Sequence, residues 1–159
     1  MEARNLLLLL LLLAVAAFVA TGDAHSKFRH LHLYSHNADP AVSVDLHRNN
    51  SFGNILVFDN LLREGPDPSS PAIARPQGMA VISDLTGAKA FTAYTITFIA
   101  GEFNGSSLSV LGLTTTTEVS DRSIVGGTGC FRTARGYVLS QYVNNNARLE
   151  EYNVYITFS

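Results

Sequence analysis

The chain has 159 residues and a formal net charge of −2 at pH 7, and 15% of its residues are charged. This is the size of one ordinary domain, and no cluster of Lys and Arg forms a basic stripe, so neither a nucleic acid nor an anionic membrane is expected as a partner. Cys130 is the single cysteine, which excludes an intrachain disulfide. Its place beside Phe131 on an expected strand favours a buried thiol.

The N-terminus predicts a secretory signal peptide over residues 1–24. Arg4 precedes an unbroken run of leucines, and small residues follow the apolar stretch. A positive start, a short apolar segment and a small-residue exit are typical of such peptides. Cleavage after Gly22 and cleavage after Ala24 both satisfy the small-residue rule. We therefore expect a secreted protein with one domain over residues 25–159.

Strand signals recur through the rest of the chain, and helical periodicity is absent there. The signals are alternating β-branched and aromatic residues, separated by turn residues and by one long irregular loop at 64–71. The expected strands cover residues 29–34, 41–47, 54–58, 78–83, 90–100, 106–112, 131–143 and 149–158. The pattern predicts an all-β fold built from hairpins, either a sandwich or a barrel.

Alternation within these strands assigns side chains to faces. His30, His32 and Tyr34 share one face of the first strand, but no third ligand stands at a suitable spacing, so a metal site is not expected. Tyr94 points to the same side as Phe98. Its first expected role is core packing, and lining of a pocket is the second.

Two further sets of polar residues carry structural expectations. Arg132 and Arg135 lie on opposite faces, and we expect either one to form a buried ion pair with an acidic residue. The candidate partners are Asp59, Glu118 and Glu151. Two sequons in turn-like contexts predict glycosylation of a secreted chain. The glycan sites would be Asn49 and Asn104.

The most distinctive stretch covers residues 125–137, VGGTGCFRTARGY. Three glycines within four residues predict a tight turn, and the residues after it alternate as a half-buried strand does. The stretch lacks the Lys-Ser/Thr ending of a phosphate-binding loop and a following helix. By itself it indicates only a corner of an all-β protein.

Read together with residues 52–59 (FGNILVFD), Gln77-Gly78, 103–106 (FNGS) and 151–155 (EYNVY), this stretch closely resembles the plant dirigent (disease-resistance-response) family. The resemblance runs from about Leu31 to the C-terminus. It implies an eight-stranded antiparallel β-barrel of the dirigent and allene-oxide-cyclase type, usually assembled as a trimer. Such barrels steer the coupling of phenoxy radicals without a cofactor or redox centre of their own.

The resemblance also points to a pocket. In lignan-forming dirigent proteins an apolar cup holds two Asp, a Tyr and an Arg at defined places, and carboxylates can accept a phenol hydroxyl. Carried over by motif, the four positions here hold other residues: Asn37, Ala80, Thr114 and Ser120. Asn and Thr can hydrogen-bond a phenol but cannot serve as a carboxylate base.

A one-residue gap in the alignment would bring Arg122 to the place of the family's Arg and Thr115 to that of Thr114. His36 could act as a base or acid near neutral pH, although a His near a strand end more often faces solvent. The candidate binding residues are therefore His36, Asn37, Ala80, Tyr94, Thr114, Ser120, Asp121 and Arg122.

Three functions remain open. The first is a secreted, apoplastic dirigent protein that binds phenoxy radicals of phenylpropanoid alcohols such as coniferyl alcohol and makes their coupling to lignans stereoselective, with a laccase or peroxidase supplying the oxidation. The second is a dehydratase or cyclase of an isoflavonoid-type alcohol, which would need His36, Asp121 or Tyr94 as a titratable group. The third is a non-catalytic defence or cell-wall barrel. A homo-oligomer, trimer or dimer, is expected in each case, and no metal or cofactor.

Overall fold

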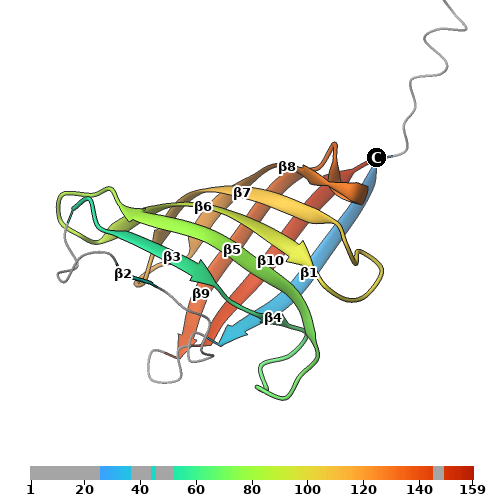
Figure 1. Ribbon diagram of the computed structural model, residues 1–159, viewed down its shortest axis with the longest axis horizontal. Coiled ribbons are helices and arrows are strands. Elements are labelled where there is room, and N and C mark those ends of the chain that lie inside the picture. Colours follow the sequence, from blue (N-terminus) through green and yellow to red (C-terminus); the bar gives the residue numbers. More distant parts are fainter. Residues whose placement is uncertain (1–25, 37–43, 46–51, 145–148) are drawn as a thin grey trace, which may run out of the picture.

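The computed structural model describes residues 26–36, 44–45, 52–144 and 149–159. Ten strands and one short 3-10 helix make up the regular structure of these residues, and every strand pairing is antiparallel (Figure 1). None of the described residues belongs to a helix that could cross a membrane. The strands are β1 (Lys27–His36), β2 (Val44–Asp45), β3 (Ile55–Asp59), β4 (Leu62–Arg63), β5 (Ala72–Ile82), β6 (Lys89–Phe98), β7 (Ser107–Thr115), β8 (Ser120–Thr128), β9 (Arg135–Asn144) and β10 (Leu149–Phe158), and the helix is η1 (Gly129–Phe131).

The strands close into a barrel. The sheet runs β1-β10-β9-β8-β7-β6-β5, and β5 returns to β1 through β4. Both β3 and β4 pair with β5, so they are two parts of one barrel strand that is interrupted at Asn60 and Leu61. The Asn60 amide donates to the carbonyl of Pro76 at 3.1 Å and keeps the interruption attached to β5. The predicted eight-stranded antiparallel barrel is confirmed.

The interior follows from alternation, because successive residues of a strand point to opposite faces. On β10, Tyr152, Val154 and Ile156 are buried, whereas the residues between them are only partly covered. The strand starts and ends where the sequence predicts, at 149 and 158. An eight-stranded barrel leaves an interior that side chains fill or that holds one small ligand.

Four phenylalanines close one end of the barrel. Phe98 ends β6, Phe158 ends β10, Phe131 lies in η1 and Phe103 lies in the loop between β6 and β7. Phe131 is fully buried, and its ring centroid lies 5.4, 4.8 and 5.0 Å from those of Phe98, Phe103 and Phe158. Tilted and edge-on contacts at these distances are favourable for aromatic pairs. We call this group the aromatic end.

The glycine-rich stretch differs from its prediction. Residues 125–128 are not a turn but the last part of β8, and the turn lies at η1 and the residues after it. A Cβ at Gly127 would lie 2.1 Å from the carbonyl oxygen of Ser107, so glycine is needed there for close pairing of β7 with β8. Gly129, with φ of +59°, starts η1 in the left-handed region.

The same turn explains a second correction. Cys130 is exposed, not buried, because η1 directs Phe131 into the barrel and leaves the preceding side chain outside. The strand predicted over 131–143 begins only at Arg135. β8 was missed altogether, because its polar and glycine residues resemble a loop.

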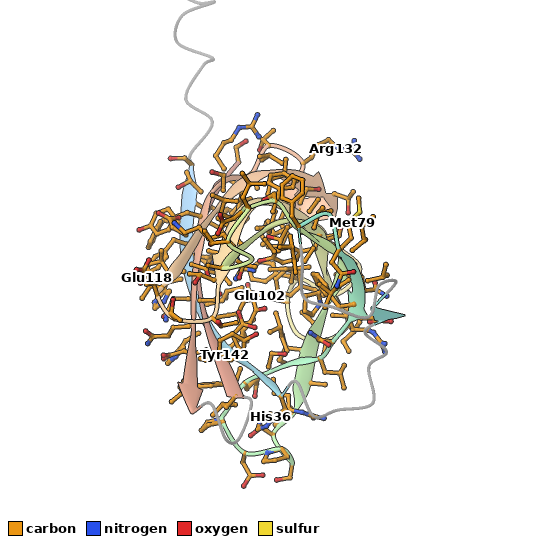
Figure 2. The ribbon with its side chains drawn as sticks, turned by 90° about the vertical axis from the view of Figure 1, so that its left-hand side faces the viewer. His36, Met79, Glu102, Glu118, Arg132 and Tyr142 are labelled. Atoms are coloured by element: carbon orange, nitrogen blue, oxygen red, sulfur yellow. The ribbon has the colours of Figure 1, made fainter. Side chains whose placement is uncertain are left out.

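The buried ion pairs expected for Arg132 and Arg135 are also wrong. Arg135 donates to the backbone carbonyls of Val125 and Ala134, both at 2.8 Å. Arg132 is exposed and lies at one end of the barrel, opposite His36 (Figure 2).

The acidic candidates have other neighbours. Asp59 pairs with Arg75 at 2.7 Å, and Glu151 contacts His32 at 2.5 Å. The Arg75 hydrogen bond lowers the pKa of Asp59. The outer face of β1 otherwise agrees with its prediction, since His30 and His32 lie on one side and His30 stacks on Tyr155 at 4.4 Å.

Candidate functional site

The interior opposite the aromatic end is polar. Arg122 from β8, Ser140 from β9 and Glu150 from β10 all point inward and are at most 7% exposed. They meet because β9 lies between β8 and β10 and pairs with both. We call this part of the interior the polar half.

Hydrogen bonds connect the three side chains. Nη2 of Arg122 donates a hydrogen bond to Ser140 Oγ, and Ser140 Oγ donates one to Glu150 Oε1 at 2.8 Å. The Tyr152 hydroxyl donates to the second carboxylate oxygen, Oε2, at 3.1 Å. Arg122 Nη2 and Glu150 Oε1 are themselves 3.7 Å apart. A buried charge is tolerated when it is paired and hydrogen-bonded in this way.

Two tyrosine rings flank the guanidinium. The Cζ of Arg122 lies 5.2 Å from the ring centroid of Tyr94 and 5.4 Å from that of Tyr152. Such cation–π contacts strengthen when water is excluded. Burial raises the pKa of both phenols well above its ordinary value, so they stay protonated. For Arg122, burial alone lowers the pKa, but Tyr94, Tyr152 and Glu150 together outweigh it and the guanidinium remains charged.

Several polar atoms of the polar half have no hydrogen-bond partner among the described residues. They include the Tyr94 hydroxyl, Arg122 Nε and the Ser35 hydroxyl, all of them buried. Buried polar groups in proteins are nearly always hydrogen-bonded, so each exception calls for a reason. Tyr94 and Arg122 are in contact through the cation–π pair, which places two free donors in one region. This arrangement suits a ligand oxygen that accepts hydrogen bonds.

Two sequence-predicted residues, Ser120 and Thr114, lie beside this cluster, because Ser120 pairs with Ser140 across β8 and β9. Ser120 is buried, and its hydroxyl lies 3.2 Å from that of Thr114 and accepts from the amide of Thr115 at 3.0 Å. Ala80 is also buried and pairs with Thr92.

Other predicted residues lie apart. Asp121 is exposed on the outer face of β8, because its neighbours Ser120 and Arg122 point inward, so it does not join them. His36 ends β1, and its buried Nε2 has no hydrogen-bond partner in the part of the chain described. Asn37 and Asn49 lie outside the described residues. Asn104 is exposed in the loop between β6 and β7.

Sequence reasoning missed three members of the polar half: Ser140, Glu150 and Tyr152. One signal for Glu150 was available. Alternation along residues 149–158 puts it on the same face as Tyr152 and Val154, so the pattern alone would have placed a carboxylate on an otherwise apolar face. No group of three or more His, Cys, Asp or Glu suited to a metal occurs among the residues described.

The fold is a closed eight-stranded barrel with buried, partly unpaired polar groups in its interior, and an interior of this size is filled by side chains or holds one small ligand. Comparison with known proteins identifies the family to which this barrel belongs. Residues 28–157 match the family model of the Dirigent-like proteins, and the chain belongs to the dirigent family.

Individual relatives are similar over most of their length. Dirigent protein 1 of Arabidopsis thaliana is 39% identical, over 98% of this chain and 99% of the relative. Pterocarpan synthase 1 of Glycyrrhiza echinata is 30% identical, over 85% of this chain and 80% of the relative. Among solved structures, the pterocarpan synthase dirigent protein GePTS1 superposes with a TM-score of 0.72 at 31% identity, over 84% of this chain and 86% of that one.

Proposed function

We propose that this chain is a secreted dirigent protein that binds a phenol-derived reactive intermediate in the polar half and imposes one face on bond formation. The observation that carries the proposal is the pair of buried donors without a partner, the Tyr94 hydroxyl and Arg122 Nε. The oxygen of a phenoxy radical or of a quinone methide is a hydrogen-bond acceptor and fits such a pair. Apolar walls around it restrict the second reactant to one approach.

The leading reaction is stereoselective coupling of phenoxy radicals of a phenylpropanoid alcohol such as coniferyl alcohol. A separate laccase or peroxidase removes one electron and one proton from each phenol. Two radicals then form one bond within the barrel, so the protein exchanges no electrons. The role of the chain is orientation, and no redox group of its own is required.

The second candidate is dehydrative ring closure of an isoflavonoid-type alcohol. It is favoured by the likeness to pterocarpan synthases, in sequence and in structure, and by the buried carboxylate of Glu150. One substrate hydroxyl takes up a proton and leaves as water, while a phenol of the same molecule forms the new C–O bond and loses its proton. The net change is loss of one water, and a carboxylate is a suitable acceptor for the phenol proton.

One experiment separates the candidates. Coniferyl alcohol is incubated with the protein alone, with a laccase alone, and with both, and the products are resolved by chiral chromatography. An isoflavanol is incubated with the protein and no oxidant. We expect coniferyl alcohol to stay unchanged without laccase and to give an enantiomeric excess with it. Conversion of the isoflavanol would establish the second candidate instead. Racemic coupling together with an unchanged isoflavanol would refute both and favour a non-catalytic barrel.

We also propose that the chain forms a homo-oligomer through an apolar outer face. Apolar side chains on β3, β5, β6 and β7 lie next to one another by strand register and remain 38–49% exposed. They are Val57, Met79, Phe91, Leu111 and Leu113, and Figure 2 marks Met79 among them. Exposed apolar side chains that lie side by side on four strands are typical of a contact between protein subunits.

Light scattering tests the assembly. Met79→Glu places a charge in the patch, and Val143→Glu changes an apolar side chain of similar exposure on β9. We expect only Met79→Glu to reduce the mass to that of a monomer. A monomeric wild-type protein, or equal effects of the two substitutions, would contradict this assembly.

Secretion completes the proposal. It is supported by the leader-like residues 1–24, which lie outside the described residues, and by the exposed sequon at Asn104. Mass analysis of protein secreted from a plant host, with and without deglycosylation, should show loss of the leader and glycan at Asn49 and Asn104. Retention of the leucine run would contradict secretion by this route.

A further inference from the structure

Arg122 and Glu150 stand out among the buried residues. In the part of the chain that the structure describes, they are the charged side chains that are buried, with 4% and 7% exposure. Their charges are opposite, their nearest charged atoms are 3.7 Å apart, and Ser140 bridges them. The polar half therefore carries a cation that is already balanced by an internal anion.

We propose that Glu150 sets the ligand specificity of the barrel by charge. It neutralises Arg122, so the polar half accepts uncharged phenols and excludes phenols that carry a carboxylate. This inference rests on the proposed function, because it assumes that ligands enter the polar half, and it adds a residue that decides which phenolic compounds are bound.

The physical argument starts from the guanidinium. A buried Arg without an anionic partner is a strong site for a carboxylate, which it binds through two parallel hydrogen bonds. Here Glu150 already lies beside Nη2, and Ser140 and Tyr152 each donate to one of its oxygens and hold it in place. A second carboxylate at Arg122 would lie close to Glu150, and like charges in a region of low dielectric repel strongly.

An uncharged phenol meets no such repulsion. Its oxygen needs only donors, and the free Tyr94 hydroxyl and Arg122 Nε supply them. The interior then keeps zero net charge after binding. Removing the charge of Glu150 without changing its shape should reverse the preference, because the unpaired cation of Arg122 would then attract a ligand carboxylate.

The chain contains a matched control. Glu151 is the next residue of β10 and points to the outer face, where it contacts His32 and Gln141. Glu150→Gln and Glu151→Gln are thus the same chemical change at neighbouring positions, one inside the barrel and one outside. Both remove one negative charge from the whole protein, so an effect of overall charge would be equal in the two variants.

The binding test uses two probes that differ only in the end of the side chain, 4-hydroxycinnamyl alcohol and 4-hydroxycinnamate, titrated calorimetrically at pH 7. We expect the wild-type protein and Glu151→Gln to bind the alcohol at least about tenfold more tightly than the carboxylate. We expect Glu150→Gln to bind the carboxylate at least about tenfold more tightly than the wild-type protein does. Measurable but equal wild-type affinities for the two probes, or equal shifts in the two variants, would overturn the inference.

A second readout separates this inference from the proposed function. Thermal unfolding of each protein is followed with and without 4-hydroxybenzoate, a smaller carboxylate. The carboxylate should raise the melting temperature of Glu150→Gln only, and if that variant does not fold unaided, the carboxylate should raise its refolding yield. A wild-type protein that binds neither cinnamyl probe would refute the proposed function, while stabilisation confined to Glu150→Gln would still support the charge rule. Absence of that stabilisation would overturn the rule itself.

Discussion

The aromatic end and the polar half are built by the same strands, yet their buried side chains differ in how completely they are packed or hydrogen-bonded. At the aromatic end, Phe131 is fully buried and contacts the rings of Phe98, Phe103 and Phe158. In the polar half, Arg122 is also buried, but its Nε has no hydrogen-bond partner in the described part of the chain. Apolar packing contributes stability wherever it is complete, whereas a buried polar group contributes little net stability and is available for binding. One barrel thus has complete apolar packing at one end and incompletely hydrogen-bonded polar groups in the other half.

The largest expected effect is on the aromatic end. Phe131→Ala should lower the free energy of unfolding by about 3–5 kcal/mol, because it removes a buried ring and leaves a cavity among three others. Phe28→Ala is the matched control, since Phe28 is 61% exposed on β1, and it should change stability by less than about 0.5 kcal/mol. Urea unfolding measures both. Similar losses in the two variants would show that the aromatic end is not where the stability lies.

In the polar half, a second substitution should restore the stability that the first one removes. Arg122→Met alone leaves the Glu150 carboxylate buried without its cation and should cost about 3 kcal/mol. Adding Glu150→Met should restore most of that loss, because replacing both members of a buried ion pair by apolar residues is close to neutral. Stereocontrol should be lost in both variants. If the double variant is as unstable as the single one, the ion pair itself is a major source of stability.

Alkaline pH should destabilise the protein through the polar half. Burial raises the pKa of Tyr94 and Tyr152 in the folded protein above the ordinary value of 10.0. The unfolded chain therefore loses these protons first, so the stability they contribute is complete below pH 10 and declines as pH rises above it. Each tyrosine accounts for about 1.4 kcal/mol per pH unit in that range. Tyr152→Phe should flatten the decline in stability measured by urea unfolding at increasing pH, and an unchanged slope would contradict the assignment.

The smallest expected change is Tyr94→Phe. Its hydroxyl has no hydrogen-bond partner among the described residues, so its removal should change stability by less than about 0.5 kcal/mol. The affinity for 4-hydroxycinnamyl alcohol should fall about tenfold, because one buried hydrogen bond to the ligand is lost. Tyr137→Phe, on the 44% exposed Tyr137 of β9, is the control and should alter neither quantity. A loss of stability in Tyr94→Phe without a loss of affinity would show that the hydroxyl serves the fold.

Much of the fold was predictable, because it depends on local pattern. Residues 149–158 alternate strictly and form a strand with those bounds. β8 was not predictable in the same way. Gly126 and Gly127 resemble a turn when read locally, yet both pair with β7 in the sheet. At Gly127 only glycine allows the close approach to the carbonyl oxygen of Ser107. Tertiary pairing overrode local propensity there.

Some features of the candidate site were also predictable from local pattern, and others depended on tertiary pairing. Alternation was enough to place Tyr94 with Ile96 and Phe98 on one face, and that face proved to be buried. The exposure of Asp121 followed from the same rule once β8 was known. The meeting of Arg122 with Glu150 had no counterpart in any local signal, because the two residues are 28 positions apart in the sequence and come together only through the β8–β9–β10 order.

The sequence by itself determined the class of fold, the family resemblance and the face on which most strand residues lie, because these depend on residue type and on a period of two. Only the tertiary structure decided which inward faces meet. Barrel closure sets the register and the neighbours across the interior, so it placed four phenylalanines together at one end and an Arg, a Ser and a Glu together in the other half. Contacts of this kind join residues distant in the chain, and local pattern carries no information about them.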